Sequence, residues 1–160
     1  FGHTVAMGVL WRDNVSYLYH APPSMPSTDA LGRIGLYPAT GGGIGMALLA
    51  SLEDNEVAEI YADRDVAGHT DLASLLAALH RVREAGYARL CVKDEQHTVA
   101  ITVGKTSYAA IGLSGWIPEE TMPAMLEALR EAAGQIQRLN VEDTSAFEPG
   151  DPAFDYRIAV

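Results

Sequence analysis

The chain has 160 residues, with 11 Lys and Arg against 21 Asp and Glu, which gives a formal net charge of −10 and a pI near 4.8. This balance argues against nucleic-acid binding, which needs a basic surface, and against binding to an anionic membrane. One cysteine, Cys91, excludes an internal disulfide and any multi-cysteine metal site, and together with the lack of a signal-peptide pattern it favours a cytoplasmic protein. Because the first residue is Phe1, we expect the chain to be a piece of a longer protein.

The N-terminal quarter of the chain predicts strands and one loop. Alternation of larger and smaller side chains predicts a strand over residues 3–11 and, after a tight turn, a returning strand over 15–21. Residues 22–29 contain three prolines and three hydroxyl side chains, which indicates a loop. A short strand is expected over residues 33–37.

A glycine cluster precedes two predicted helices. The longest uncharged run, residues 34–52, contains Pro38 and five glycines, so it predicts a strand, a glycine loop and a buried helix and not a membrane span. The helix is expected over residues 44–52, because its apolar side chains lie on nearly all sides. Residues 53–61 predict a second helix that begins with acidic side chains, as the helix dipole favours.

The C-terminal half predicts two further helices that flank three strands. Asp71 can cap a helix that ends at Gly86, and Pro118 suits the first turn of a final helix over 119–139. The strands between them are expected over residues 87–92, 97–103 and 106–114. Residues 140–160 are predicted to be an extended tail.

The order of these elements favours one α+β domain over residues 1–139. Most neighbouring strands are joined by turns too short for parallel crossovers, so we predict a roughly six-stranded antiparallel sheet flanked by helices.

The glycine cluster 41–45 is the first candidate site. It places free backbone N–H groups at the start of a helix, which suits an anion such as a small carboxylate. The spacing matches neither a phosphate loop nor a dinucleotide fingerprint. The alternative is that the glycines only permit a tight turn into the helix.

The histidines and the single cysteine give little indication of a metal site or a catalytic site. The five histidines form no pair with metal-ligand spacing, so no metal site and no cofactor is predicted. Cys91 lies in an apolar strand segment and is expected to be a buried, inert thiol. His97 begins a strand and could point into a pocket. We predict no enzyme activity; a small hydrolase or isomerase that uses His97 or Cys91 is the minor alternative.

Five segments, in order, resemble the C-terminal part of IclR-type transcriptional regulators. Residues 36–50 resemble the family segment PLHATALGKALLA, 83–88 resemble RERGYA, 99–103 resemble VAAPV, 109–115 resemble AALSVSGP, and the opening 2–18 resembles GETVHLAVL…VVYL. The resemblance covers residues 1–139. It implies an effector-binding domain with a GAF-like fold, which in the family follows a winged helix-turn-helix DNA-binding domain that is absent from this chain.

The resemblance also implies a function and a site. The family senses small molecules, mostly organic or aromatic acids, so we expect a carboxylic-acid effector, DNA binding only through the missing domain, and a homodimer or homotetramer. The expected ligand-binding residues, including His97 from the strand argument above, are Gly43, Ile44, Gly45, Met46, His97, Thr98, Gly112 and Ser114. The alternative function is a homo-oligomerisation domain with a vestigial pocket and an apolar surface near Trp11 or Trp116.

Two departures from the family pattern bear on the ligand. Met46 stands where the family has Lys, and Gly112 stands where it has the first serine of an S-x-S pair. Both suggest a roomier, less polar pocket, so we expect an aromatic or branched acid. A three-residue turn at 104–106 is predicted to pair Thr98 with Gly112 and to bring Thr98 and Ser114 onto one face of the sheet.

Overall fold

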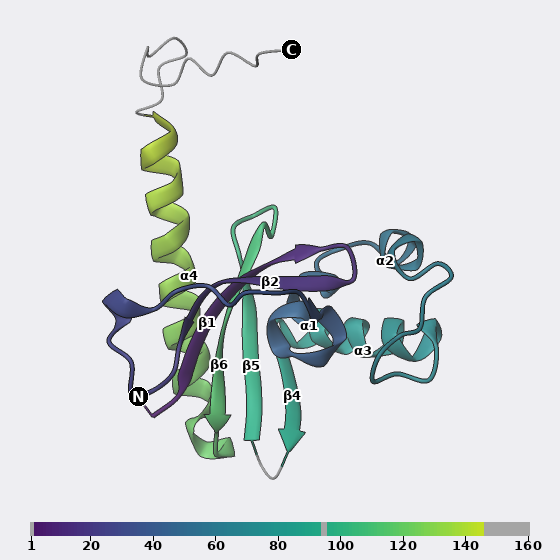
Figure 1. The fold of residues 1–160 in the computed structure, drawn as a ribbon, viewed down its shortest axis with the longest axis horizontal. Coiled ribbons are helices and arrows are strands. Elements are labelled where there is room, and N and C mark those ends of the chain that lie inside the picture. The colour runs from purple at the N-terminus through teal and green to yellow at the C-terminus, as the bar shows by residue number, and fades with distance from the viewer. Residues whose placement is uncertain (1, 94–95, 146–160) are drawn as a thin grey trace.

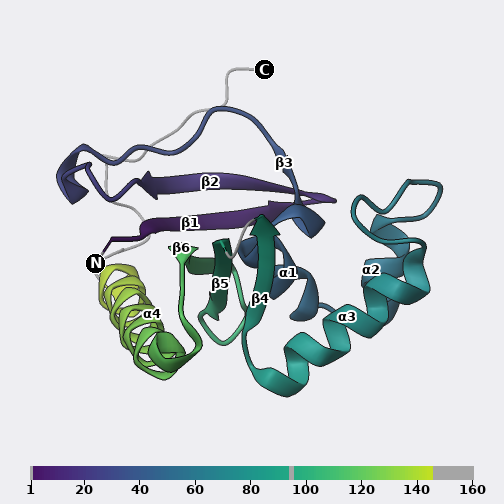
Figure 2. The ribbon, with the colours of Figure 1, turned by 90° about the horizontal axis from the view of Figure 1, so that it is seen from below.

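The computed structural model describes residues 2–93 and 96–145, which form one curled six-stranded sheet with helices on both faces (Figures 1 and 2). The strands are β1 (Thr4–Trp11), β2 (Asn14–Ala21), β3 (Tyr37–Pro38), β4 (Ala88–Lys93), β5 (Gln96–Val103) and β6 (Ala109–Trp116). Their order is β3-β2-β1-β6-β5-β4, and every neighbouring pair is antiparallel. The predicted α+β class and antiparallel sheet are therefore confirmed.

Four α-helices cover the sheet. They are α1 (Gly43–Ala50), α2 (Asp54–Ile60), α3 (Leu72–Ala85) and α4 (Met122–Ser145). In Figure 2, α1, α2 and α3 lie to one side of strands β4–β6 and α4 lies to the other. The predicted helix ends at Asp71 and Gly86 are confirmed: the Asp71 carboxylate accepts the Ser74 N–H at 2.7 Å, and Gly86 has a left-handed φ of 74°. No helix within the described ranges is long and apolar enough to cross a membrane.

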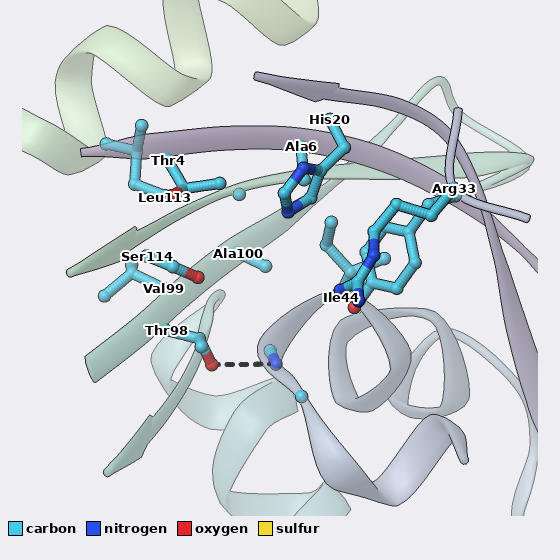
Figure 3. Close-up of a pocket in the computed structure, with 14 residues that line it drawn as sticks. Thr4, Ala6, His20, Arg33, Ile44, Thr98, Val99, Ala100, Leu113 and Ser114 are labelled. Carbon is cyan, nitrogen blue, oxygen red and sulfur yellow. Dashed lines mark hydrogen bonds between the residues drawn. The ribbon is translucent and has the colours of Figure 1, made fainter. Parts of the chain in front are cut away.

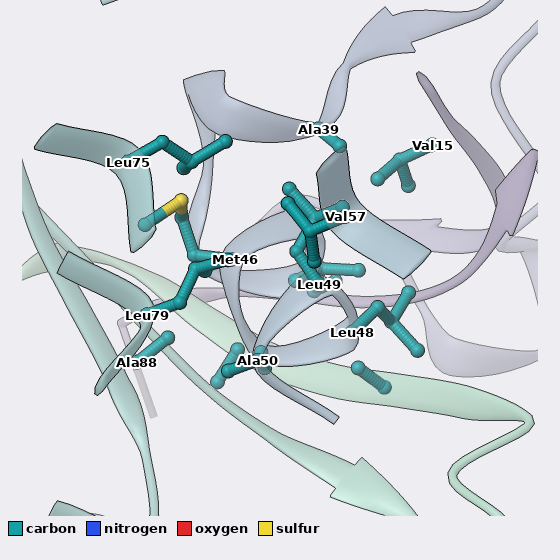
Figure 4. Packing of buried hydrophobic residues seen from close by; sticks show 14 of the residues in the cluster. Val15, Ala39, Met46, Leu48, Leu49, Ala50, Val57, Leu75, Leu79 and Ala88 are labelled. Atoms are coloured by element: carbon teal, nitrogen blue, oxygen red, sulfur yellow. The ribbon is translucent and has the colours of Figure 1, made fainter. Parts of the chain in front are cut away.

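Alternation along the strands builds two separate cores. On one side, all eight residues of α1 are buried, and its Leu49 packs in one cluster with Leu75 and Leu79 of α3 (Figure 4). On the other side, β5 and β6 pack against α4 through Val99, Ile111, Leu126 and their neighbours. The helix α1 is apolar all round because it is enclosed all round.

Three predicted boundaries are wrong. The third strand covers only Tyr37–Pro38, because the preceding Arg33 N–H bonds the Tyr17 carbonyl outside any strand ladder. The sixth strand begins at Ala109 because residues 104–108 form a loop, in which Gly104 and Ser107 have φ values of 82° and 49°. The last helix continues to Ser145, six residues past its predicted end, and the rest of the predicted tail lies outside the described residues.

The longer loop shifts the register between β5 and β6 by two residues. Thr98 pairs with Ser114, and Ala100 pairs with Gly112, whereas the three-residue turn predicted Thr98 opposite Gly112. A shift of two keeps every side chain on its face, since side chains alternate with a period of two. Thr98 and Ser114 therefore share a face, as predicted, although the predicted turn is wrong.

Candidate functional site

A cavity of about 100 Å³ lies where the N-terminus of α1 meets the sheet; we call it the α1 cavity (Figure 3). Strands β5 and β6 form one wall, β1 and β2 another, and the loop after β2 contributes one side chain. Its polar lining consists of Thr4, Tyr17, His20, Arg33, Thr98 and Ser114, and its backbone and apolar lining includes Ala6, Gly42, Gly43, Ile44, Ala100 and Gly112.

Gly112 brings α1 close to the sheet and does not enlarge the cavity. A Cβ added there would lie 2.8 Å from the Val99 carbonyl oxygen, 3.0 Å from the Ala100 Cβ and 3.3 Å from Ile44 Cγ1. The space that a serine would occupy is thus already filled. The prediction of a roomier pocket at this position is wrong, and a volume near 100 Å³ lies below the roughly 300–1,000 Å³ of drug-sized ligand sites.

The N-terminus of α1 is held by a side chain of the sheet. The Gly43 N–H donates to Thr98 Oγ1 at 2.9 Å, which satisfies one of the backbone donors that a helix start leaves open (Figure 3). Gly43 has no Cβ, and one placed there would lie 3.0 Å from the same hydroxyl oxygen and 3.3 Å from the Ala100 Cβ. The glycines thus permit close packing, as one of the two alternatives predicted, and the helix start faces the cavity. The carboxylate site stays a prediction.

Five of the eight predicted ligand residues line the α1 cavity, namely Gly43, Ile44, Thr98, Gly112 and Ser114. The other three do not. Gly45 packs against the backbone of Ala39, and Met46 lies in the core beside Leu75 and Leu79 (Figure 4).

His97 is the third residue outside the cavity. It alternates with Thr98 along β5 and therefore projects from the opposite face of the sheet, opposite Gly115. Its Nδ1 is buried and has no hydrogen-bond partner in the part of the chain that the structure describes.

Arg33 is the charged residue that the sequence reading missed. It is the only Lys or Arg between Arg12 and Arg64, and it lies shortly before the glycine cluster, which was the available signal. Its guanidinium carbon stands 4.5 Å above the centre of the Tyr37 ring, and its N–H bonds the Tyr17 carbonyl at 3.1 Å. It forms no ion pair with a carboxylate of residues 2–91 or 96–139, whose side chains the structure describes.

Arg33 also shapes the protonation of its neighbours. Desolvation lowers the pKa of His20 below its usual value, and the Arg33 charge lowers it further. Desolvation raises the pKa of Tyr17, and Arg33 partly opposes this. At neutral pH the cavity therefore holds one cation, Arg33, beside a neutral imidazole and a neutral phenol.

The Ser114 hydroxyl is available to a ligand. It points into the α1 cavity (Figure 3) and makes no hydrogen bond with any residue that the structure describes. A hydroxyl that both donates and accepts, together with a guanidinium, gives the cavity the groups needed to bind a small organic anion.

Other chemistry finds less support. No group of three or more His, Cys, Asp or Glu suited to a metal ion occurs among the described residues. Cys91 is exposed, so its predicted burial is wrong; it lies on β4, the edge strand of the sheet. Cys91 pairs in register with His97, but the structure gives no hydrogen bond between their side chains.

The class of protein follows from comparison. Residues 1–138 match the family model of the C-terminal domain of the bacterial transcriptional regulator IclR. The chain therefore belongs to the IclR family of transcriptional regulators, as its C-terminal, effector-binding domain, and the resemblance found in the sequence is confirmed. This is a family of regulators and not of enzymes. No curated protein sequence matches the chain.

Solved structures share the fold at low sequence identity. The C-terminal domain of Escherichia coli KdgR is 23% identical over 86% of this chain and 87% of that domain, with a TM-score of 0.72. Thermotoga maritima IclR is 20% identical over 86% of this chain, with a TM-score of 0.70. The inducer-binding domain of Acinetobacter PobR, in a double-mutant complex with 3-hydroxybenzoic acid, is 20% identical over 84% of this chain and 87% of that domain, with a TM-score of 0.67. The chain spans 61% of the length of T. maritima IclR and of a regulator from Rhodococcus sp. RHA1.

Proposed function

We propose that this domain senses a small carboxylic acid in the α1 cavity and controls DNA binding by a winged helix-turn-helix domain in the same regulator. The observation that carries the proposal is the free Ser114 hydroxyl, which faces the cavity with no partner among the described residues. A half-buried hydroxyl that lines a cavity and is not used by the protein can donate a hydrogen bond to a ligand or accept one from it. We also propose that the regulator acts in the cytoplasm and forms a homodimer or homotetramer.

The size of the cavity favours a short acid. A cavity of roughly 150 Å³ holds one benzene molecule, which has six carbon atoms, so about 100 Å³ suits a ligand of about four non-hydrogen atoms. The expectation of an aromatic acid rested on Gly112 and Met46. Neither enlarges the cavity, because one is crowded and the other lies in the core. The related PobR domain was studied with an aromatic acid, so aromatic acids belong in the test.

The mechanism that we propose is a population shift. The cavity walls come from three parts of the domain: the β1–β2 pair, the β5–β6 pair and the start of α1. A ligand that contacts all three favours the arrangement in which they lie closest, and that bias changes how the domains or subunits are arranged.

Thermal unfolding with a panel of acids tests the proposal. The panel runs from glyoxylate, propionate and pyruvate to benzoate and 3-hydroxybenzoate, each at millimolar concentration. A ligand at 100 times its Kd adds about 2.7 kcal/mol, or a Tm increase of roughly 5–10 °C at this size. Ser114→Ala should abolish the increase, whereas Ser16→Ala, a matched hydroxyl loss on β2 outside the cavity, should retain it. No increase with any acid would refute the proposal.

A second candidate function is homo-oligomerisation. An apolar groove of about 820 Å³ runs between α4 and strands β1, β2 and β6, and Leu18 on its edge is 52% exposed. Open apolar surface on this scale is typical of an interface. Trp11 and Trp116 are each 62% exposed and lie outside this groove, so an apolar interface near either of them stays a separate prediction. Leu18→Glu, followed by mass measurement with light scattering, should reduce the oligomer if a second copy covers the groove.

A further inference from the structure

Arg33 lies at the α1 cavity because two contacts and the small residue before it fix its position. Its backbone N–H donates to the Tyr17 carbonyl at 3.1 Å, and its guanidinium stacks on the Tyr37 ring. The residue before it must be small: a Cβ on Gly32 would lie 2.5 Å from the Tyr17 carbonyl oxygen and 3.1 Å from that of Leu18. Gly32 thus lets this segment lie directly on β2, which places the Arg33 side chain beside the cavity.

The charge of Arg33 is not neutralised by any carboxylate that the structure describes. Three other arginines have carboxylate partners within 2.8 Å, in the pairs Arg64–Asp13, Arg83–Asp54 and Arg89–Glu119. Arg33 has no such partner in the part of the chain that the structure describes, although the protein carries a net charge of −10. An arginine that is fixed in place, faces a cavity and lacks an acid partner is suited to an anionic ligand.

One backbone donor that an anion could use is already bonded. The Gly43 N–H, at the start of α1, donates to Thr98 Oγ1. An anion at that amide would have to displace the threonine hydroxyl. Arg33 offers its donors without any such competition.

We propose that Arg33 binds the carboxylate of the effector and makes the α1 cavity select acids over neutral molecules of the same shape. The inference rests on the proposed function and assigns the charge recognition to one residue. The carboxylate lies at the Arg33 side of the cavity, and the rest of the ligand extends toward Ile44 and the Ser114 hydroxyl. The stacked guanidinium can form two parallel hydrogen bonds to a carboxylate, whereas the matching amide offers only one acceptor oxygen.

The experiment compares each acid with its amide: propionate with propionamide, and benzoate with benzamide. Kd values are measured by calorimetry on the wild type and on Arg33→Gln, Arg33→Lys and Gly32→Ala. Arg130→Gln removes the same charge from α4, on the other side of the sheet, and Gly41→Ala adds a Cβ where nothing lies within 4 Å. Unfolding of each variant without ligand shows whether it is folded.

The wild type should bind the better acid at least about 10-fold more tightly than its amide, since a charge-assisted bond accounts for about 10- to 100-fold in affinity. Arg33→Gln should reduce acid binding by that factor and leave amide binding unchanged. Arg33→Lys should weaken acid binding less than Arg33→Gln does, and Gly32→Ala should weaken acid binding because it displaces Arg33. Both controls should match the wild type.

Other outcomes overturn the inference. If Arg33→Gln, folded, binds the acid as tightly as the wild type does, the assignment to Arg33 is wrong while the sensing function stands. The same conclusion follows if acid and amide bind the wild type equally. If neither acids nor amides bind the wild type, the proposed function fails and the inference fails with it.

Discussion

Replacing Gly45 with alanine should destabilise the domain strongly, although the family resemblance assigned this glycine to the ligand site. In the structure Gly45 lies on the side of α1 that packs against the turn before the helix. A Cβ there would lie 2.0 Å from the Ala39 carbonyl oxygen and 2.5 Å from its Cα and carbonyl carbon. These atoms are backbone, so no side chain can rotate away.

The magnitude follows from the crowding. Contacts below 3.0 Å are essentially never made by real Cβ atoms, so the helix and the turn must separate by about 1 Å. Every residue of α1 is buried, which means that the shift disturbs the packing of the whole helix. Overpacking of this kind costs about 1–3 kcal/mol or more, and the better helix propensity of alanine offsets up to about 1 kcal/mol. Because the clash is with backbone, we take the top of that range, about 3 kcal/mol, which leaves a net loss of about 2–3 kcal/mol and a Tm lower by roughly 4–12 °C.

Urea unfolding followed by circular dichroism measures this loss. Gly41→Ala is the matched control, because its Cβ would meet nothing within 4 Å and should change stability by less than about 0.5 kcal/mol. If Gly45→Ala is as stable as the wild type, the packing argument is wrong. If it is stable and loses only ligand binding, the family assignment of Gly45 is the better explanation.

Three further changes test other parts of the structure. Thr98→Val removes the acceptor of the Gly43 N–H and should cost about 1–2 kcal/mol in urea unfolding; an unchanged stability would show that the bond contributes nothing. Tyr61→Phe removes a buried hydroxyl that has no partner among the described residues, and should raise stability by about 1 kcal/mol. Burial raises the pKa of Tyr61 to about 12 from 10.0, so wild-type stability should fall as the pH rises from 10 to 12, and the variant should lack that part of the fall. A hydrogen bond from Arg83 lowers the pKa of Asp54, so this pair stabilises the fold above pH 3.8, and the stabilisation is lost as the pH falls below that value. Asp54→Asn should therefore flatten the dependence of Tm on pH below 3.8. A variant with the same slope as the wild type would contradict this reasoning.

Local signals predicted most of the fold. Asp71 and Gly86 fix the two ends of α3 through a cap and a left-handed residue, both of which depend only on neighbouring backbone. The enclosed helix α1 and the paired strands β1 and β2 follow in the same way from the spacing of apolar side chains. The loop at 104–108 was missed because its conformation depends on two left-handed residues, one of which, Ser107, carries no sequence mark of that conformation.

The lining of the α1 cavity was predicted where the argument used faces and was missed where it used contiguous residues. Thr98 and Ser114 share a face under any register error of two residues, so the wrong turn did not separate them. His97 neighbours Thr98 in sequence and therefore had to project from the other face. On a helix, successive side chains are about 100° apart, so four consecutive residues, 43–46, cannot all face one cavity.

Arg33 shows what neither periodicity nor family motif could supply. Its importance comes from the absence of an ion-pair partner among the described carboxylates, and such an absence is a property of the folded chain. The protein has a net charge of −10, and three other arginines form ion pairs with carboxylates that lie 29 to 51 residues away in the sequence. The sequence alone does not predict which arginine pairs with which acid. The sequence shows only that Arg33 is the single cation between Arg12 and Arg64. The fold adds that Gly32 holds it on β2 at the edge of a cavity whose helix start is already bonded to Thr98. The charge selection that we propose therefore rests on one side chain outside the family's glycine loop, and the comparison of acids with amides on the wild type and on Arg33→Gln measures the contribution of that side chain.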